Sequence, residues 1–194
     1  MLFEPVPRLV LRWRTEAGDG LEHVEIRPVG GEPSGGLTVS GTLIAPPEDG
    51  GRAIGYRLAV DGDWRVVSFD LDASDGTHIA LRSNGAGRWS DGDGTPLPAL
   101  NDALDIDLGG TPLTNLLPVR RLFGEGRRAA ADLQVVYIEA ATLAVSIQRQ
   151  RYEPLRPGRL YRYVSLDTGF TADLPVDRHG LVVDYPGLWR RVSL

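Results

Sequence analysis

Apolar and polar residues alternate with a period of two along most of this chain, a pattern typical of β-strands with one buried face. Segment 64–71 is instead apolar on both faces, as expected of a more central strand. Gly, Pro, Asn and Asp separate the runs at intervals of about 8 to 12 residues, which favours a meander of antiparallel strands. We therefore expect eleven to thirteen strands, with the other runs at 9–13, 22–27, 37–43, 54–61, 79–81, 133–137, 143–151, 160–166, 170–176, 181–185 and 188–194.

Only one segment, TPLTNLLPVRRLF, predicts a helix, and it is short, near 112–123. One helix cannot cover so many strands, so the sheet has to cover itself. The predicted fold class is mainly β, a single strongly curved antiparallel sheet that forms a half-barrel or a barrel-like layer. Its concave side is either a packed core or an apolar cavity.

The length of 194 residues favours a single β domain over 1–194. YRLAVDGDWR at 56–65 and YRYVSLDTGF at 161–170 resemble each other weakly. They suggest an internal duplication with halves of about 1–97 and 98–194, although chance similarity between strand-turn segments explains the match about as well.

Composition excludes several chemistries. The 24 Gly and 14 Pro suit many tight turns, there is no Cys, and all 21 basic residues are Arg. Without Lys the chain has no Schiff-base amine, no P-loop lysine and no Ser-Lys dyad. Without Cys it has no thiolate nucleophile and no thiolate metal site. The net charge of -5 and the pI of about 5.2 disfavour nucleic acid as a partner.

The first thirteen residues include Glu4, Arg8, Arg12 and two prolines, so they lack the apolar region of a signal peptide. No stretch has the length and apolarity of a membrane span. We therefore expect a cytoplasmic protein.

Familiar catalytic and metal-binding motifs are weak or missing. No G-x-S-x-G occurs, and the histidines at 23, 78 and 179 lack a paired spacing. Asp105 and Asp107 lie on the same face of LDIDL. They are expected to be solvated or to pair with Arg120 and Arg121, and the alternative is a catalytic pair of carboxylates. We predict no catalytic residue, no metal and no cofactor.

The last third carries an arrangement that departs from this pattern. The apolar face of Leu143, Val145 and Ile147 continues into Arg149 and Arg151. Arg162 likewise lies between Leu160 and Val164, and charges on an apolar face are costly unless they are paired or at a wet rim.

One interpretation is an apolar pocket whose mouth carries guanidinium groups for phosphate, carboxylate or sugar hydroxyls. The other is that Glu22, Glu139 or Asp184 neutralises these arginines, or that they guard a sheet edge. Trp13, Trp64 and Tyr137 are either core aromatics or stacking platforms for a sugar or an acyl chain. The candidate ligand-binding residues are Trp13, Glu22, Tyr137, Arg149, Arg151 and Arg162, with Glu22 as the partner of the arginines in the empty protein.

Several blocks resemble the putative glycolipid-binding family of bacterial proteins, first defined as a domain of unknown function. They are DIDLGGTPLTNLLPVRRL at 105–122, RQRYEPL at 149–155 and YRYVSLDTGFTADLPVDRHGLVVDYPGLWRR at 161–191, with Trp13, Gly20 and Glu22. The resemblance implies a mainly β domain similar to the bacterial lipoprotein carriers, in which a curved antiparallel sheet cups an acyl chain. It supplies no established binding residues to transfer to this chain.

The function expected from these features is non-catalytic binding of a glycolipid or another acylated amphiphile in an apolar cavity with an Arg-lined mouth. The alternative is a sugar- or lipid-directed hydrolase or isomerase that uses paired carboxylates, Glu22 with an aspartate such as Asp184. A structural module with a solid core is a third possibility. An exposed edge strand would make a homodimer easy to form.

Overall fold

A computed structural model describes residues 1–31 and 35–192. Within these ranges the chain forms fourteen strands, one α-helix and four short 3₁₀ helices. Nine strands make a large, wholly antiparallel sheet in the order β13-β14-β1-β2-β3-β4-β5-β6-β7. Their bounds are Leu9–Thr15 (β1), Leu21–Pro28 (β2), Leu37–Ile44 (β3), Ala53–Val60 (β4), Val66–Ala73 (β5), His78–Ser83 (β6), Trp89–Asp91 (β7), Asp184–Tyr185 (β13) and Trp189–Val192 (β14).

The remaining five strands make a small sheet in the order β12-β11-β10-β9-β8. Its pairs are antiparallel except β8 and β9, which run parallel. A parallel pair needs a crossover, and α1 (Leu116–Phe123) provides it. The strand bounds are Asp105–Leu108 (β8), Ala131–Ile138 (β9), Val145–Arg156 (β10), Leu160–Ser165 (β11) and Thr171–Pro175 (β12); the 3₁₀ helices span Val29–Gly31, Pro47–Asp49, Pro98–Leu100 and Leu113–Asn115.

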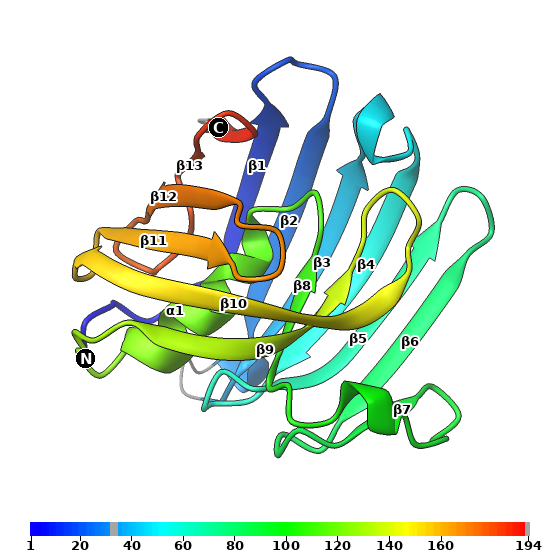
Figure 1. Cartoon of the computed structure of the whole chain (residues 1–194), viewed down its shortest axis with the longest axis horizontal. Coiled ribbons are helices and arrows are strands. Elements are labelled where there is room, and N and C mark those ends of the chain that lie inside the picture. Colours follow the sequence, from blue (N-terminus) through cyan, green and yellow to red (C-terminus); the bar gives the residue numbers. More distant parts are fainter. Residues whose placement is uncertain (32–34, 193–194) are drawn as a thin grey trace.

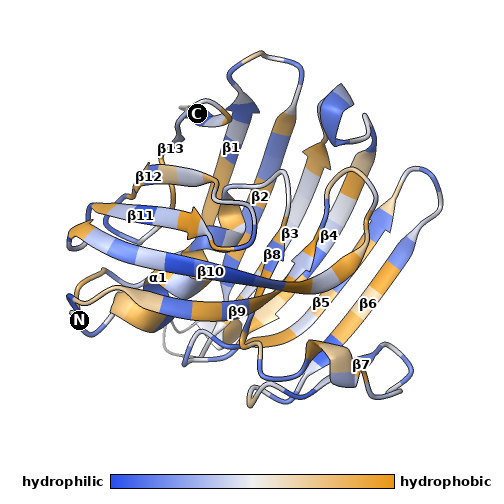
Figure 2. Cartoon of the chain, in the orientation of Figure 1, coloured by the Kyte–Doolittle hydropathy of each residue, from blue (hydrophilic) through white to orange (hydrophobic). Residues whose placement is uncertain are grey.

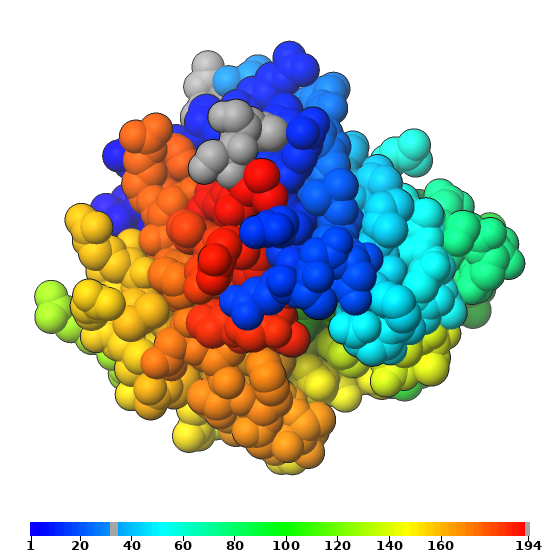
Figure 3. Space-filling model, turned by 90° about the horizontal axis from the view of Figure 1, so that it is seen from above, coloured from blue at the N-terminus to red at the C-terminus, as the bar shows by residue number. Residues whose placement is uncertain are grey.

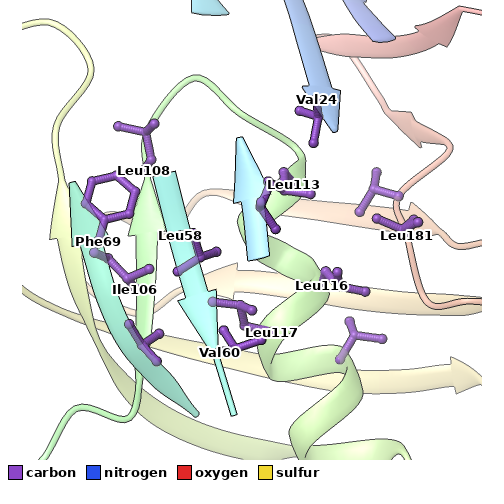
Figure 4. Packing of buried hydrophobic residues seen from close by; sticks show 14 of the residues in the cluster. Val24, Leu58, Val60, Phe69, Ile106, Leu108, Leu113, Leu116, Leu117 and Leu181 are labelled. Carbon is purple, nitrogen blue, oxygen red and sulfur yellow. The ribbon is translucent and has the colours of Figure 1, made fainter. Parts of the chain in front are cut away.

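Figure 1 shows the small sheet lying across one face of the curled large sheet, with α1 between the two layers. This position explains why α1 is buried on more than one side, at Leu116, Leu117, Val119 and Phe123 among others. Figure 4 shows the same packing from close by, with the helix leucines near residues of the large sheet such as Leu58 and Val60. The two layers therefore share one hydrophobic core.

Alternation along the strands decides which side chains enter this core. Trp13 and Val24 point inward and are fully buried, whereas Val10 is 39% exposed on the other face. Figure 2 shows the resulting alternation of hydrophobic and hydrophilic bands along the strands of the large sheet.

The two layers are joined at one edge, where the chain passes from β12 of the small sheet to β13 of the large sheet. An isolated antiparallel bridge there joins Val176, just after β12, to Val182, just before β13. Within the large sheet, β14 then pairs with β1. The indole Nε1 of Trp13 donates a hydrogen bond of 3.0 Å to the carbonyl of Val182. Seen from above in Figure 3, the red chain around β13 and β14 lies between the blue β1–β2 hairpin and the orange β11–β12 hairpin.

The predicted mainly β fold, the strong curvature and the short helix are confirmed. The prediction of a single sheet of eleven to thirteen strands is wrong, since fourteen strands form two sheets. The physical reason is the β8–α1–β9 crossover, which begins a second layer instead of continuing the meander. The run at 188–194 corresponds to β14, and its last two residues lie outside the described residues. The single domain and its internal duplication stay predictions.

Candidate functional site

A pocket of about 290 Å³ lies between the inner face of the small sheet and the β13–β14 edge of the large one. We call it the inter-sheet pocket. Its aromatic lining comes from four strands and one turn: Tyr137 (β9), Tyr163 (β11), Phe170, Tyr185 (β13) and Trp189 (β14). Its principal polar lining is Asp49, Asp107, Thr111, Asn115, Gln148, Ser165 and Thr168.

The aromatic side chains form a packed wall. The rings of Tyr163 and Tyr185 meet edge to face with centroids 6.4 Å apart, and Phe170 stacks on Tyr185 at 6.3 Å. Tyr152 packs behind Tyr163 at 5.4 Å. Such contacts fix the orientation of each ring, so the wall does not have to be ordered when a ligand arrives.

Hydrogen bonds hold the polar side chains in place. Asp107 accepts one hydrogen bond from the Thr114 hydroxyl and one from the Gln150 amide, each of 2.7 Å. The same Gln150 amide donates to Gln148 Oε1 at 3.0 Å. Alternation along β10 turns Gln148 and Gln150 toward the pocket side of the sheet, and the network fixes their rotamers.

Asn115 is positioned by a separate pair of contacts. Its Oδ1 accepts a hydrogen bond of 2.7 Å from the buried hydroxyl of Tyr152. Its Nδ2 donates to the carbonyl of Pro112 at 3.3 Å.

The pocket is acidic and its phenols are neutral. Burial raises the pKa of Asp107, although the hydrogen bonds from Thr114 and Gln150 oppose this effect. Burial, together with the negative charge of Asp107, raises the pKa of Tyr137 to about 12 and also raises the pKa values of Tyr163 and Tyr185. Asp49 has a raised pKa because of burial and the neighbouring Glu48.

Glu22 lies behind the wall of the pocket and is fully buried. The hydroxyls of Tyr56 and Thr111 each donate a hydrogen bond of 2.7 Å to its carboxyl group. Gly41 makes room for the Tyr56 ring, since a Cβ at this position would lie 2.0 Å from the ring. Burial outweighs the two hydrogen bonds and raises the pKa of Glu22 to about 7.

Two of the six predicted ligand residues are associated with this pocket. Tyr137 lines it, and Glu22 contacts it through Thr111. Trp13 is buried in the core. The expectation that Glu22 neutralises the arginines is wrong, because its hydrogen-bond partners among the described residues are Tyr56 and Thr111.

The three arginines lie on the outer face of the small sheet instead of at an inward-facing mouth. Each pairs with an aspartate: Arg149 with Asp167, Arg151 with Asp132, and Arg162 with Asp173. Arg151 and Arg162 stand directly opposite their partners across neighbouring strands. Their charges are therefore compensated at the solvent-exposed surface. The prediction that Glu22, Glu139 or Asp184 neutralises these arginines is wrong, because cross-strand and turn aspartates do so instead.

Arg149 also borders a second, more open depression of about 530 Å³, which we call the outer groove. Its apolar lining consists of Leu104, Leu122, Leu133 and Leu166. Arg149 and Gln148 are neighbours on β10 and point to opposite faces. The outer groove is thus not a continuation of the inter-sheet pocket.

The other predicted carboxylates also have their own partners. Asp184 pairs with Arg190 at 3.4 Å, and no hydrogen bond joins it to Glu22 among the described residues. Asp105 is buried and accepts from Arg121 Nε at 3.1 Å, which is the ion-pair alternative that the sequence left open. Within residues 1–31 and 35–192 no group of three His, Asp or Glu side chains is placed to hold a metal ion. No helix in these ranges is long and apolar enough to cross a bilayer.

Sequence reasoning missed most of the pocket, including Asp107 as a pocket residue, Asn115, Gln148, Tyr163, Tyr185 and Trp189. One signal was present in QRQRY, where Gln148, Gln150 and Tyr152 alternate with the arginines. A strand that is polar on both faces borders either water on both sides or a polar cavity on one.

Comparison with known proteins adds family information. Residues 10–191 match the model of a family described as putative glycolipid-binding. The crystal structure of a DUF1089 family protein from Pseudomonas aeruginosa is similar, with a TM-score of 0.68 and 33% sequence identity over 98% of this chain and 95% of that one. No curated protein matches this chain.

Proposed function

Since the chain belongs to the putative glycolipid-binding family, we propose that it binds a glycolipid or a similar amphiphile without transforming it, and that the polar head enters the inter-sheet pocket. The observation that carries this proposal is the combination of an aromatic wall with hydrogen-bonded polar side chains in one cavity. Sugar rings present apolar C–H faces and a rim of hydroxyls, so they need both kinds of surface.

The size of the pocket supports a head group of one sugar ring. At about 290 Å³ it lies at the lower end of the range of about 300 to 1,000 Å³ that small-ligand sites occupy. A single sugar ring suits a site of this size. An acyl chain therefore extends out of the pocket.

The rim of the pocket suits the beginning of such a chain. Phe170 and Leu188 line the pocket and are also 42% and 44% exposed. The pocket is polar inside and apolar at its rim, and a glycolipid changes from polar to apolar in the same order. Its sugar would lie inside the pocket and its first methylenes at the rim.

Binding of alkyl glucosides, measured by calorimetry below their micelle concentration, tests the proposal. Each methylene that reaches the rim contributes about 0.8 kcal/mol, so affinity rises about fourfold per carbon from methyl upward and then levels off. Phe170→Ser reduces this gain, whereas Val67→Ser, at a similarly exposed position on β5, does not. Absence of binding, or equal loss in both variants, contradicts the proposal.

The ligand roles predicted for Arg149, Arg151 and Arg162 make the opposite prediction. If an arginine-lined mouth holds the head group, replacing these residues with Ala weakens binding while Phe170→Ser does not. If the inter-sheet pocket holds it, the arginine variants bind like the wild-type protein. The same calorimetric series separates the two sites.

A hydrolase that uses paired carboxylates is the second candidate, because Asp49 and Asp107 both line the inter-sheet pocket. Both oxygens of Asp107 already accept hydrogen bonds within the protein, which favours a fixed recognition group over an acid or base that exchanges protons. Incubation with alkyl glucosides followed by NMR decides the point. Under the binding proposal the glycosidic bond stays intact.

A further inference from the structure

The inter-sheet pocket has an unusual charge for this chain. The protein contains 21 arginines and no lysine, yet the charged side chains that line the pocket among the described residues are two aspartates, Asp49 and Asp107. The arginines of the nearby sheet are paired on its other face. The lining therefore carries a negative charge that no basic side chain of the lining balances.

Asp107 illustrates the imbalance most clearly. Its two oxygens accept hydrogen bonds from Thr114 and Gln150, which are neutral donors. Neutral donors orient a carboxylate and leave its net charge in place. Burial raises the pKa of Asp107, so a cation that enters the pocket favours the charged form of this carboxyl group and does not have to displace an ion-pair partner first.

The charge of Asp107 acts across the pocket. It contributes to the raised pKa values of Tyr137, Tyr163 and Tyr185, which come from β9, β11 and β13. These three rings, with Phe170 and Trp189, also present aromatic faces, whose quadrupole attracts cations. Two independent features, uncompensated carboxylates and an aromatic wall, thus favour the same kind of ligand.

We propose that the inter-sheet pocket selects a cationic head group, an amino sugar with a protonated amine, over neutral and anionic sugars. This inference rests on the proposed function, because it specifies the head group for the same pocket. A phosphate or uronic acid group would face the two aspartates with no arginine to receive it. A neutral sugar would use the aromatic wall and the polar side chains but leave the charge of Asp107 unused.

Four methyl glycosides provide the test: the glucosaminide, glucoside and glucuronide, which are nearly the same size, and the larger N-acetylglucosaminide. Calorimetry is carried out at about pH 6, where an amine with a pKa of about 8 is protonated. Because hydrogen bonds to charged groups are stronger than neutral ones, we expect the glucosaminide to bind about tenfold more tightly than the two neutral glycosides. We expect the glucuronide to bind most weakly.

Asp107→Asn keeps the size of the side chain and removes its charge. It should lower affinity for the glucosaminide more than affinity for the glucoside, so that the preference for the amine is lost. Asp132→Asn, on the outer face, is the matched control and should retain the full preference. Circular dichroism checks the fold, and Asp49→Asn provides a second test if Asp107→Asn does not fold, since it should reduce the same preference.

The outcomes distinguish the inference from the function beneath it. Equal affinities for the charged and neutral glycosides, or a preference that survives both Asp107→Asn and Asp49→Asn, overturn the amino-sugar inference and leave the proposed function standing. Absence of binding for all four glycosides, together with no binding of the longer alkyl glucosides, overturns both.

Discussion

Replacing Glu22 with Gln should weaken the dependence of the protein's stability on pH between about pH 5 and 8. Glu22 is fully buried, and its partners Tyr56 and Thr111 are both neutral. Burial therefore raises its pKa from 4.5 to about 7 in the folded protein. In the unfolded chain the carboxyl group is in water and keeps its ordinary pKa.

The sign of the effect follows from proton binding. Between pH 4.5 and about 7 the folded state holds a proton on Glu22 that the unfolded state has released. The stabilisation is therefore fully present below the unfolded pKa and is lost as the pH rises through the folded one. At 1.36 kcal/mol per pKa unit the loss reaches about 3 kcal/mol above neutral pH.

Gln has nearly the same shape as Glu and does not titrate. Glu22→Gln should match the wild-type free energy of unfolding at about pH 4 and exceed it by up to about 3 kcal/mol at about pH 8. Urea unfolding, followed by tryptophan fluorescence, measures both values. Glu153→Gln, at an exposed position on β10, is the control and should keep the wild-type pH dependence.

A difference between Glu22→Gln and wild type that stays constant from about pH 5 to 8 would refute the reasoning, because the charge of Glu22 would then not be what the burial penalises. So would a variant that is less stable than wild type at about pH 8. In that case the two hydrogen bonds from Tyr56 and Thr111 would outweigh the cost of burying the carboxylate.

Two further substitutions test buried contacts, one in the large sheet and one between the small sheet and α1. Gly41→Ala should lower the free energy of unfolding by about 2 kcal/mol or more, because the new methyl group would lie 2.0 Å from the Tyr56 ring. Gly55→Ala, where the nearest atom is 3.9 Å away, is the control and should be tolerated. Equal urea unfolding midpoints for the two variants would contradict this account. Asp105→Ala should cost about 3 kcal/mol, because it leaves the guanidinium of Arg121 partly buried without its carboxylate; thermal unfolding measures the loss, and an unchanged melting temperature would show that Arg121 reaches solvent at no cost.

Local alternation predicted most of the strands because each has one buried and one exposed face. It did not predict how they pair, since pairing depends on turns and crossovers more than on periodicity. Alternation also failed to predict where one strand begins, since the sequence placed its start at Trp64. Trp64 has a φ of 65° and closes the turn that begins at Asp61, so β5 begins only at Val66.

The orientation of β10 was the decisive ambiguity for the site. An apolar stripe that ends in Arg149 and Arg151 suggested an inner face, but these residues face outward. Asp132 on β9 lies directly opposite Arg151 on β10, and a single sequence does not predict this pairing register. Because cross-strand ion pairs compensate the arginine charges, the arginine face of β10 can lie against solvent. The opposite face of β10, which carries the glutamines, then lies toward the pocket.

The distribution of buried polar side chains links stability to the pocket. Ten polar or charged residues are buried among the described residues. Six of the ten either line the inter-sheet pocket or hydrogen-bond to a residue that does, namely Glu22, Thr111, Thr114, Asn115, Gln150 and Ser165. Each such group costs free energy to bury unless its partners are in place.

Their partners come from both layers. Thr111, which follows β8 of the small sheet, donates a hydrogen bond to Glu22 on β2 of the large sheet. Within the small sheet, Gln150 on β10 donates to Asp107 on β8. Closing the two layers therefore assembles the pocket wall, and the wall is ordered before any ligand arrives. The free-energy cost of burying these polar groups is met during folding, so ligand binding does not have to supply it. Buried polar side chains are therefore concentrated around the pocket, where a specific polar surface can contact a ligand.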